Sequence, residues 1–542
     1  MGDLSDGARR SAEDPGARAL LSARDVAAID ARSAALGRSG AALMAEAGRA
    51  VARAAEARWS GRDGAAAILA GPGNNGGDGF VAATALMAAG RSVRLYALGA
   101  GPEGGDAAEA RAAFEAAGGV VRPIEEAHFD GAAYGVDALF GVGLARAISG
   151  AAADAIERMN ASAAPALAVD MPSGVEADQG RALGPAVRAD VTVTFIRPKR
   201  GHFLSDGALL SGDLEVVDIG QPAAAMAAIE TPVAREIEVE ADGSMFGLAF
   251  VKAALDAHKY DYGHVAAVVG GRGCSGAGRL AARAALRSGA GLATVLAPPE
   301  AMSECAAQLT AVMLREIADD GALAQRLADK RVNAVVFGPG AGLGEAVLRR
   351  VAAILAAGPR TAVLDADALS AHEADPEALF RAVRTSEAMV VLTPHGGEFA
   401  RLFPDLAARL RSDAADPMGK IEATRAAAAR SGAVVLFKGL DTVVAAPDGR
   451  AGAHAAVRAR AAPWLATAGA GDVLAGMIAG LAARGWPAFE AACGGAWLHA
   501  SAARAAGAGL IAEDLPEAAS AVFRDLESRR STRRFPGSSP LV

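Results

Sequence analysis

The chain has 542 residues, of which 52% are hydrophobic and 21% are charged, and its net charge at pH 7 is −8. At roughly 150 residues per domain it is too long for one hydrophobic core, and its ordinary composition excludes an evident attraction to nucleic acid or anionic membranes. The N-terminal segment is charged, and no uncharged apolar run reaches the ~18 residues of a membrane helix. We therefore expect a cytoplasmic enzyme that acts on small molecules.

Short Val-, Ile- and Leu-rich runs alternate with Ala-rich helical patterns in the first half of the chain. These runs cover residues 65–70, 92–98, 135–139, 166–169 and 190–196. Such alternation predicts a mostly parallel sheet wrapped by helices, which is an α/β fold. The pattern stops after 216–219.

A second series of apolar runs follows a segment without persistent periodicity, residues 222–242, which we interpret as a linker. The later runs cover residues 265–269, 292–296, 334–337, 362–364, 389–392 and 434–437. The two halves share no visible repeat, so we expect two different α/β domains, at 19–221 and 243–525. The polar ends, 1–18 and 526–542, are predicted to be disordered.

A glycine-rich turn, GPGNNGGDG at 71–79, follows the first apolar run and precedes a helical pattern. Glycines at this point let backbone N–H groups approach a ligand, and the spacing GxGxxG is typical of phosphate binding. Asp78 would repel a pyrophosphate, and no acid ends the next strand where a dinucleotide site needs a ribose partner. Asn74, Asn75 and Asp78 instead favour a hydroxyl, an amide or a hard cation.

Two acids follow later strands of the same predicted sheet, Asp137 and Asp170. Ligands of open parallel sheets bind beyond the carboxyl ends of the strands, so these loops could converge with the glycine-rich turn. Asp137, Asn75 and Ser173 would form an all-oxygen set for a group 1 cation or Mg²⁺. Taken singly, each acid is more often a turn residue or a strand-end cap.

The second half contains another glycine-rich turn before an apolar helix, TAGAGDVLAG at 467–476. Small residues and the helix dipole favour a phosphate there, and Asp472 could deprotonate an attacking hydroxyl, although an N-cap is an equal alternative. Loops after other strands, at 337–344, 364–369, 392–402 and 437–442, are expected at the same sheet edge. Taken alone, His395 would be interpreted as a structural histidine and Lys438 as a surface lysine. Their positions at strand ends make both of them candidates for a functional role.

Five motifs of the first half, GPGNNGGDGF, VDALFGVGL, VDMPSG, KRGHFLSDGA and VVDIG, resemble the N-terminal domain of NAD(P)H-hydrate epimerases over residues 19–220. The resemblance implies a Rossmann-like α/β/α sandwich that epimerises C6 of hydrated NADH or NADPH, with Asp170 in proton transfer. It implies a potassium ion on Asn75, Asp137 and Ser173. It also implies substrate contacts from Asp170 and from the residues Asn74, Asn75, Gly76, Gly77, Asp78, Gly141, Val142, Gly143, Leu144, Ala145, Arg146 and Ala147.

The motifs FGPGAGLG, LDADAL, LTPHGGEFARL, FKGLDT and TAGAGDVLAG resemble the ADP- or ATP-dependent NAD(P)H-hydrate dehydratases, which have a ribokinase-like fold, over residues 243–525. The resemblance implies that the C6 hydroxyl of the S epimer is phosphorylated and phosphate is then eliminated, with Asp472 as base and Mg²⁺ on the nucleotide. It implies substrate contacts from Ala277, Gly342, His395 and Asp472. The implied nucleotide contacts are Lys438, Gly439, Leu440, Asp441, Thr442 and Gly471. Ser370, the sequence GAG at 276–278 and TAGAGD depart from the common family pattern.

The sequence thus predicts a bifunctional repair enzyme for hydrated nicotinamide nucleotides, with a homo-oligomer expected from the family resemblance. A vitamin or sugar kinase with an attached nucleotide-binding domain is the alternative, and a non-catalytic first domain is another. Three widely spaced cysteines without CxxC spacing predict free thiols, and Cys274 receives no role. The sequence does not decide whether ADP or ATP is the phosphoryl donor, or whether hydrated NADH or hydrated NADPH is the preferred substrate.

Overall fold

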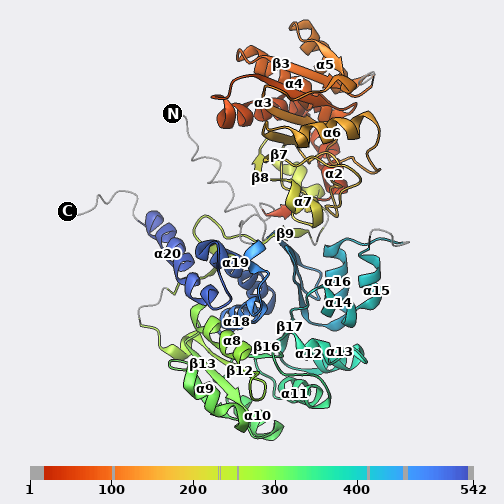
Figure 1. The fold of residues 1–542 in the computed structure, drawn as a ribbon. Helices are drawn as coiled ribbons and strands as arrows, with labels where there is room; N and C mark the ends of the chain where they lie inside the picture. Colours follow the sequence, from red (N-terminus) through yellow and green to blue (C-terminus); the bar gives the residue numbers. More distant parts are fainter. Residues whose placement is uncertain are drawn as a thin grey trace, which may run out of the picture. The chain divides into compact units, whose positions relative to one another are not determined.

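The computed structural model describes residues 18–99, 104–229, 231, 233–252, 256–411, 416–455 and 462–534. The chain forms two compact units that divide between Ala234 and Arg235, inside the segment interpreted as a linker. Each unit has a sheet flanked by helices, which confirms the predicted α/β class (Figure 1). No helix within the described ranges is long and apolar enough to span a membrane.

The first unit is built on a parallel sheet of order β4-β3-β2-β5-β6-β7-β8. Its strands are β2 (Ala65–Ala70), β3 (Val93–Ala97), β4 (Val121–Pro123), β5 (Ala132–Ala138), β6 (Ala166–Val169), β7 (Val191–Phe195) and β8 (Asp213–Val217), preceded by the short β1 (Ala19–Leu20). Its α-helices are α2 (Ala23–Ala35), α3 (Gly40–Trp59), α4 (Asn74–Ala88), α5 (Gly105–Ala116), α6 (Ala151–Ala161) and α7 (Ser205–Leu210).

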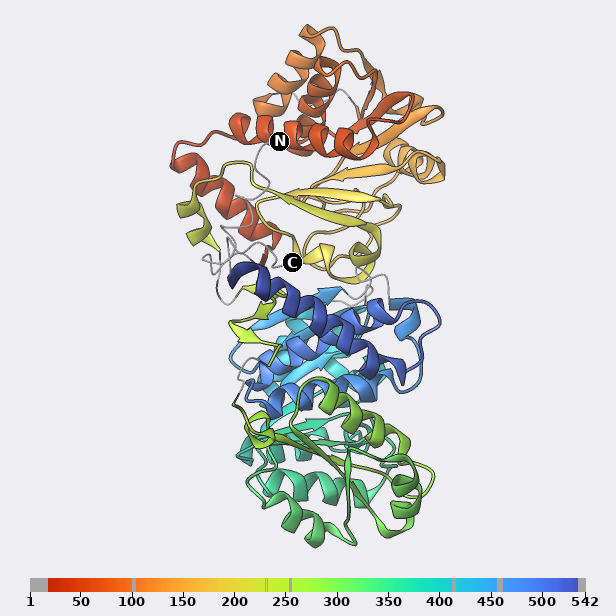
Figure 2. The same cartoon turned by 90° about the vertical axis from the view of Figure 1, so that its left-hand side faces the viewer.

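Alternate residues of β2 supply two apolar cores, one on each face of this sheet. Ile68 packs with residues of α3, α4 and α5, whereas Leu69 packs with residues of α6. Figures 1 and 2 show helices on both sides of this sheet. Strands buried on both faces explain why the apolar runs are nearly continuous in the sequence. The unit is therefore a three-layer α/β/α sandwich.

The second unit has a longer sheet that is parallel from β18 through β17, β16, β15, β12 and β13 to β14. These strands are β12 (His264–Val268), β13 (Leu292–Ala297), β14 (Met313–Glu316), β15 (Ala334–Phe337), β16 (Thr361–Leu364), β17 (Met389–Leu392) and β18 (Val434–Phe437). Two antiparallel strands, β19 (Asp441–Ala445) and β20 (Ala451–Ala455), extend the sheet beyond β18. The unit also contains the short strands β9 (Ala234–Glu236), β10 (Ser244–Met245) and β11 (Leu248–Ala249).

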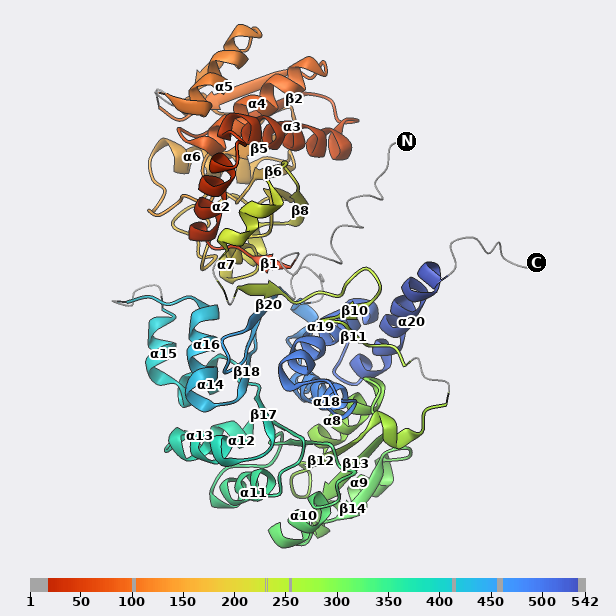
Figure 3. The ribbon, with the colours of Figure 1, turned by 180° about the vertical axis from the view of Figure 1, so that it is seen from behind.

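Helices cover both faces of this second sheet (Figure 3). One face carries α8 (Gly276–Arg287), α18 (Ala470–Ala483), α19 (Ala488–Ala506) and α20 (Asp514–Arg534). The other helices are α9 (Met302–Gln308), α10 (Asp320–Leu327), α11 (Glu345–Ala356), α12 (Asp367–Ser370), α13 (Pro376–Thr385), α14 (Gly396–Leu402), α15 (Pro404–Arg409), α16 (Lys420–Ser431) and α17 (Ala462–Leu465). Every residue of α18 from Val473 onward is buried, so this helix lies in the centre of the core.

The prediction of a disordered tail at 526–542 is wrong for residues 526–534, because α20 continues to Arg534. Leu526 is fully buried in the core of the second unit and packs against Gly243, which holds this end of the chain in helical form. Residues 1–17 and 535–542 lie outside the described residues, so the predictions there remain predictions. Inside 222–242, the short 3-10 helix η3 (Ala223–Ala228) and strand β9 occur, and Ile237 and Val239 are buried.

Candidate active sites

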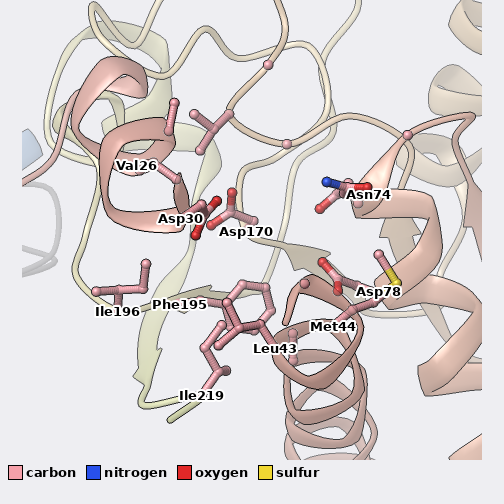
Figure 4. Close-up of a pocket in the computed structure, with 18 of the residues that line it drawn as sticks. Val26, Asp30, Leu43, Met44, Asn74, Asp78, Asp170, Phe195, Ile196 and Ile219 are labelled. Atoms are coloured by element: carbon pink, nitrogen blue, oxygen red, sulfur yellow. The ribbon is translucent and has the colours of Figure 1, made fainter. Parts of the chain in front are cut away.

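The start of α4 is packed so closely that its glycines have no room for side chains. A Cβ atom built on Gly77 would lie 2.5 Å from Sδ of Met44 in α3, and one on Gly79 would lie 2.7 Å from Cβ of Ala138 in β5. The helix is thus wedged between the sheet and α3. Asp78, which lies between these two contacts, extends into a pocket (Figure 4).

This pocket has a volume of about 660 Å³ and lies wholly within the first unit. Its walls come from α2, α3, the start of α4, the loops after β5 and β6, and the segment after β7. Apolar side chains such as Leu43 and Phe195 form much of the wall, and the acids Asp30, Asp78 and Asp170 also line it (Figure 4). A fourth acid, Asp106 of α5, lines the same pocket. An apolar cavity with a few polar groups is typical of small-molecule sites.

Asp170 directly follows β6 and has φ = 65°, a left-handed conformation that Asp adopts more readily than most residues. Its Oδ1 accepts hydrogen bonds from the Lys199 ammonium and, at 3.0 Å, from the Thr194 hydroxyl. Within the described residues Oδ2 has no hydrogen-bond donor, and a Cβ atom built on Gly141 would lie 3.2 Å from it. One carboxylate oxygen is therefore fixed by the protein and the other is left to the pocket.

Lys199 is 1% exposed and is held in place from several sides. Its ammonium also donates to the Thr194 hydroxyl at 2.8 Å and to the Phe195 carbonyl at 3.1 Å. Burial alone would raise the pKa of Asp170, but the Lys199 ammonium outweighs it and lowers this pKa below 3.8. Asp170 is thus an ionised carboxylate at neutral pH.

His202 fixes the backbone on which Asp170 stands. Its Nδ1 lies 3.0 Å from the amide nitrogen of Lys199 and accepts that hydrogen bond, which leaves the proton on Nε2. Nε2 then donates to the Asp170 carbonyl at 2.8 Å. The side chain of Asp170 and its main chain are therefore both anchored to the segment that contains Lys199 and His202.

Asp137 and Ser173 form a buried pair beneath the glycine-rich turn. The Ser173 hydroxyl and amide donate to the Asp137 carboxylate at 2.6 and 2.7 Å, and the Phe140 amide donates to the Ser173 hydroxyl at 2.8 Å. Burial raises the pKa of Asp137 to about 6. The nearby Asn75 has a buried Nδ2 without a partner, and its Oδ1 lies beside Gly141.

The structure brings most of the predicted epimerase contacts to the pocket but not all. Asn74, Asn75, Asp78 and Asp170 line it, as do residues 141–144. Gly76 and Gly77 instead serve the packing of α4, and residues 145–147 are exposed and do not line the cavity.

In the second unit, Asp472 lies in the first turn of α18, whose N-cap is Gly469 in a left-handed conformation (φ = 87°). Among the described residues no side chain caps this helix, so the N–H groups of Gly471 and Asp472 are available to an anion, whereas that of Ala470 donates to the Thr467 carbonyl. Burial, followed by the charge of Asp365, raises the pKa of Asp472 to about 6, although Lys438 opposes the shift. A carboxylate with this pKa is suited to act as a base near neutral pH.

Lys438 lies beside this helix start and is surrounded by carboxylates. Its Nζ is 2.7 Å from Oδ1 of Asp365 and 3.8 Å from Oε2 of Glu398, and a Cβ atom built on Gly471 would lie 3.6 Å from it. Burial would lower the pKa of Lys438, but Asp365 and Glu398 raise it above 10.5. Lys438 is therefore a fixed positive charge next to the N-terminus of α18.

The other predicted residues of the second unit have mixed surroundings. Residues 438–440 form the turn between β18 and β19, where the Thr442 hydroxyl donates to the Gly439 carbonyl and Asp441 pairs with Lys420. His395 is the N-cap of α14, where its Nδ1 accepts from the amides of residues 397 and 398. Gly342 donates its N–H to Asp367 at 2.8 Å, and Ala277 lies at the start of α8.

Sequence reasoning missed several polar residues that shape the two sites, namely Thr194, Lys199, His202, Asp365, Asp367, Glu398 and Lys420. Lys199, His202, Asp365, Asp367 and Glu398 lie inside the family motifs described above, but nothing in the spacing links them to Asp170 or Lys438. The three cysteines are free thiols as predicted, with Cys274 exposed and Cys305 and Cys493 buried.

Comparison with known proteins assigns both units. The family model for NAD(P)H-hydrate dehydratase matches residues 266–522, and that for the YjeF-related protein N-terminus matches residues 40–201. The bifunctional NAD(P)H-hydrate repair enzyme Nnr of Moorella thermoacetica is 36% identical over 521 residues, covering 90% of this chain and 93% of the relative. That of Escherichia coli is 32% identical over 462 residues, covering 83% of each chain.

Among solved structures, an ADP/ATP-dependent NAD(P)H-hydrate dehydratase of Bacillus subtilis, co-crystallised with ATP and Mg²⁺, is 25% identical. It covers 53% of this chain and 96% of its own, with a TM-score of 0.42. The long alignment with the two repair enzymes confirms the resemblance seen in the motifs. The chain belongs to the family of bifunctional NAD(P)H-hydrate repair enzymes.

Proposed function

We propose that the first unit interconverts the R and S forms of NADH or NADPH hydrated at C6, and that the second unit dehydrates the S form at the expense of ADP or ATP. Membership of the family supports both activities. The observation that carries the first is an ionised Asp170 whose Oδ2 faces a substrate-sized cavity. The observation that carries the second is Asp472 beside an uncapped helix start and Lys438.

In the proposed epimerase reaction, Asp170 takes part in proton transfer at the oxygen carried by C6 of the hydrated ring. The hydroxyl is carried by a carbon next to ring N1, so its departure leaves a cation that N1 stabilises, and water can return on either face. Asp170 is held ionised by Lys199 and is aimed by Thr194 and His202, so it can stabilise this cation and accept a proton from the returning water.

The proposed potassium ligands fit a hard cation. Asp137, Asn75 and Ser173 offer a carboxylate, an amide and a hydroxyl oxygen. The Nδ2 atom of Asn75 has no hydrogen-bond partner among the described residues, which is consistent with an amide that is oriented by its oxygen binding a cation. Potassium bound there would supply the positive charge that the buried Asp137 lacks. It would also hold the loop after β5 at the wall of the pocket.

In the proposed dehydratase reaction, Asp472 accepts the proton of the C6 hydroxyl while the γ-phosphoryl group of ATP, or the β-phosphoryl group of ADP, is transferred to that oxygen. Phosphate then leaves C6, and loss of a proton from C5 restores the ring double bond. Lys438 and the N–H groups at the start of α18 are placed to stabilise the transferring phosphoryl group.

The proposed nucleotide contacts are Lys438 to Thr442 and Gly471. Asp441 and Thr442 are engaged within the protein, so we propose that this turn contributes mainly through its backbone. The proposed substrate contacts are Ala277, Gly342, His395 and Asp472. Glu398 lies near Lys438, and the charge of Asp367 acts on Asp472; their carboxylates fit a Mg²⁺ ion bound mainly through nucleotide phosphates, which the ion would neutralise.

The proposed setting is the cytoplasm, where three free thiols are stable, and the proposed assembly is a homo-oligomer, as the family resemblance favours. Light scattering after size exclusion would measure the mass of the assembly in solution.

The direct test is recovery of NADH absorbance from a mixture of R- and S-hydrated NADH, with K⁺, Mg²⁺ and either ADP or ATP. Full recovery, faster than spontaneous epimerisation, is expected and identifies the phosphoryl donor. Asp170→Asn should recover only the S fraction, and Asp472→Asn should recover nothing. Asn tolerates the left-handed backbone at 170, so the first variant isolates the carboxylate.

Other outcomes would favour other functions. Recovery of only the S fraction by the unmodified enzyme would make the first unit a binding module. No recovery, combined with phosphorylation of a free sugar or pyridoxal, would identify a kinase.

A further inference from the structure

Asp78 is a second acid that faces the epimerase cavity and has no assigned chemical role. The close contacts of Gly77 and Gly79 fix this turn of α4, and a Cβ atom built on Gly48 of α3 would lie 2.6 Å from the Asp78 carbonyl. Among the described residues, no hydrogen bond or ion pair satisfies the Asp78 carboxyl group. Figure 4 shows it extending into the pocket from α4, whereas Asp170 enters from the loop after β6.

Epimerisation at C6 requires one proton transfer on each face of the ring, whereas one fixed carboxylate reaches only one of these faces. Departure of the hydroxyl requires a proton on its oxygen, and return of water requires a base on the face from which it adds. Asp170 is held ionised by Lys199 and can serve as that base. The departing oxygen needs an acid from elsewhere in the cavity.

We propose that Asp78 is this acid, so that Asp78 and Asp170 form the proton-transfer pair of the epimerase. The inference rests on the proposed epimerase function. Neutral Asp78 protonates the departing C6 oxygen, the C6–O bond breaks, and water and a ring cation form. Water then bonds to C6 from the other side and gives its proton to Asp170. One proton has moved from Asp78 to Asp170, and its return through water resets the enzyme, with the roles exchanged in the opposite direction.

The charges around Asp78 favour its protonated form. Burial, and then the negative charge of Asp170, raise the pKa of Asp78 well above 3.8, Asp30 of α2 adds to the shift, and Lys199 opposes it. From α3 the facing residues are the apolar Leu43 and Met44, and α5 adds another acid, Asp106. Two carboxyl groups whose surroundings move their pKa values apart are the usual basis of an acid and base pair.

The experiment uses the full chain and purified R-hydrated NADH without ADP or ATP, so that the second unit does not consume the product. The R and S forms are separated by chromatography at times short compared with spontaneous epimerisation, over a range of pH. Asp78→Asn should lower kcat by about 10²- to 10⁴-fold with little change in KM. Asp78→Ala should show the same loss, and added formate should restore part of the rate, increasingly as pH falls, because its protonated form replaces the missing acid.

Asp106→Asn is the matched control, because it removes one acid from the same cavity. It should affect KM rather than kcat and should not respond to formate. Wild-type kcat should fall at high pH as Asp78 ionises, and this alkaline limb should disappear from the residual activity of Asp78→Asn. Formate rescue also shows that the alanine variant is folded.

The proposal is overturned if the wild-type enzyme converts R to S while Asp78→Asn retains wild-type kcat, or if both Asp78 variants change only KM and formate has no effect. In those cases Asp78 would bind substrate without transferring a proton. If the wild-type enzyme itself fails to convert R to S, the proposed epimerase function fails and this assignment fails with it.

Discussion

Lys199 binds Asp170 through a single carboxylate oxygen, from a position 29 residues later in the chain. The ion pair therefore joins the loop after β6 to the segment after β7, and it leaves the second oxygen of Asp170 facing the pocket. Both partners are mostly buried, so neither charge is screened by water.

Replacing Lys199 with Met should abolish most epimerase activity and lower the free energy of unfolding by about 3 kcal/mol, because a buried carboxylate loses its partner. Lys199 lowers the pKa of Asp170, so the pair stabilises the fold above pH 3.8 and this contribution is lost as pH falls further. Urea unfolding of the wild type and of Lys199→Met, at pH 7 and in acid, measures the difference between their free energies of unfolding, which should be smaller in acid. The double variant Lys199→Met, Asp170→Asn should regain stability but not activity, and additive losses would contradict a coupled pair.

The dehydratase rate should depend on the ionisation of Asp472. A base works only when deprotonated, so kcat should fall as pH decreases through about 6 and should level off above it. Stopped-flow recovery of NADH absorbance from S-hydrated NADH at saturating nucleotide measures this profile. A rate that is flat from pH 5 to 8 would rule out Asp472 as the base, provided that chemistry is rate-limiting.

Gly471 should be replaceable without loss of the fold but not without loss of activity. A Cβ atom there would make ordinary contacts, 3.6 Å from Nζ of Lys438 and 3.7 Å from Oδ2 of Asp365, within the proposed phosphate site. Gly471→Ala should therefore unfold like wild type while the dehydratase loses nucleotide affinity. In the matched variant Gly476→Ala, the new methyl would meet the Ala281 carbonyl at 2.2 Å and should cost about 1–3 kcal/mol. Equal effects of both changes would argue against a site at Gly471.

Potassium should stabilise the first unit. At a concentration of 100 times its dissociation constant, a bound ion adds about 2.7 kcal/mol to the free energy of unfolding. Melting in KCl against choline chloride, together with the epimerase rate, tests this expectation. Ser173→Ala should remove the potassium effect because it deletes one oxygen ligand and a donor to Asp137. A potassium effect that survives this change would place the ion elsewhere.

The strands with dense apolar runs were predictable from the sequence, and β2, β6, β15, β17 and β18 have the predicted bounds. Burial on both faces leaves a continuous signal in such strands. By contrast, β20, with the sequence AGAHA, lacks any Val, Ile or Leu and depends on its pairing with β19. The helix through Leu526 was missed for a related reason, since the polar segment around it is ordered by a tertiary contact.

The candidate sites were predictable where a motif is continuous in the sequence, as at Asn74 to Asp78 and at Asp472, although both lie in the first turns of helices. The partners of these residues were not. Lys199 and His202 act on Asp170 only because β6 and β7 are neighbours in the sheet. The pairing of Lys438 with Asp365 likewise requires β16, β17 and β18 to lie side by side.

The uncapped start of α18 has a consequence for the durability of the enzyme. A serine or aspartate at position 469 would normally complete such a helix, whereas Gly469 leaves the amides of Gly471 and Asp472 without a side-chain acceptor. At the proposed site, a bound phosphate would complete the helix in place of a side chain, so part of the affinity for nucleotide would be free energy that stabilises the fold. Bound nucleotide would then stabilise the folded dehydratase unit, and depletion of nucleotide would leave this unit inactive and easier to unfold.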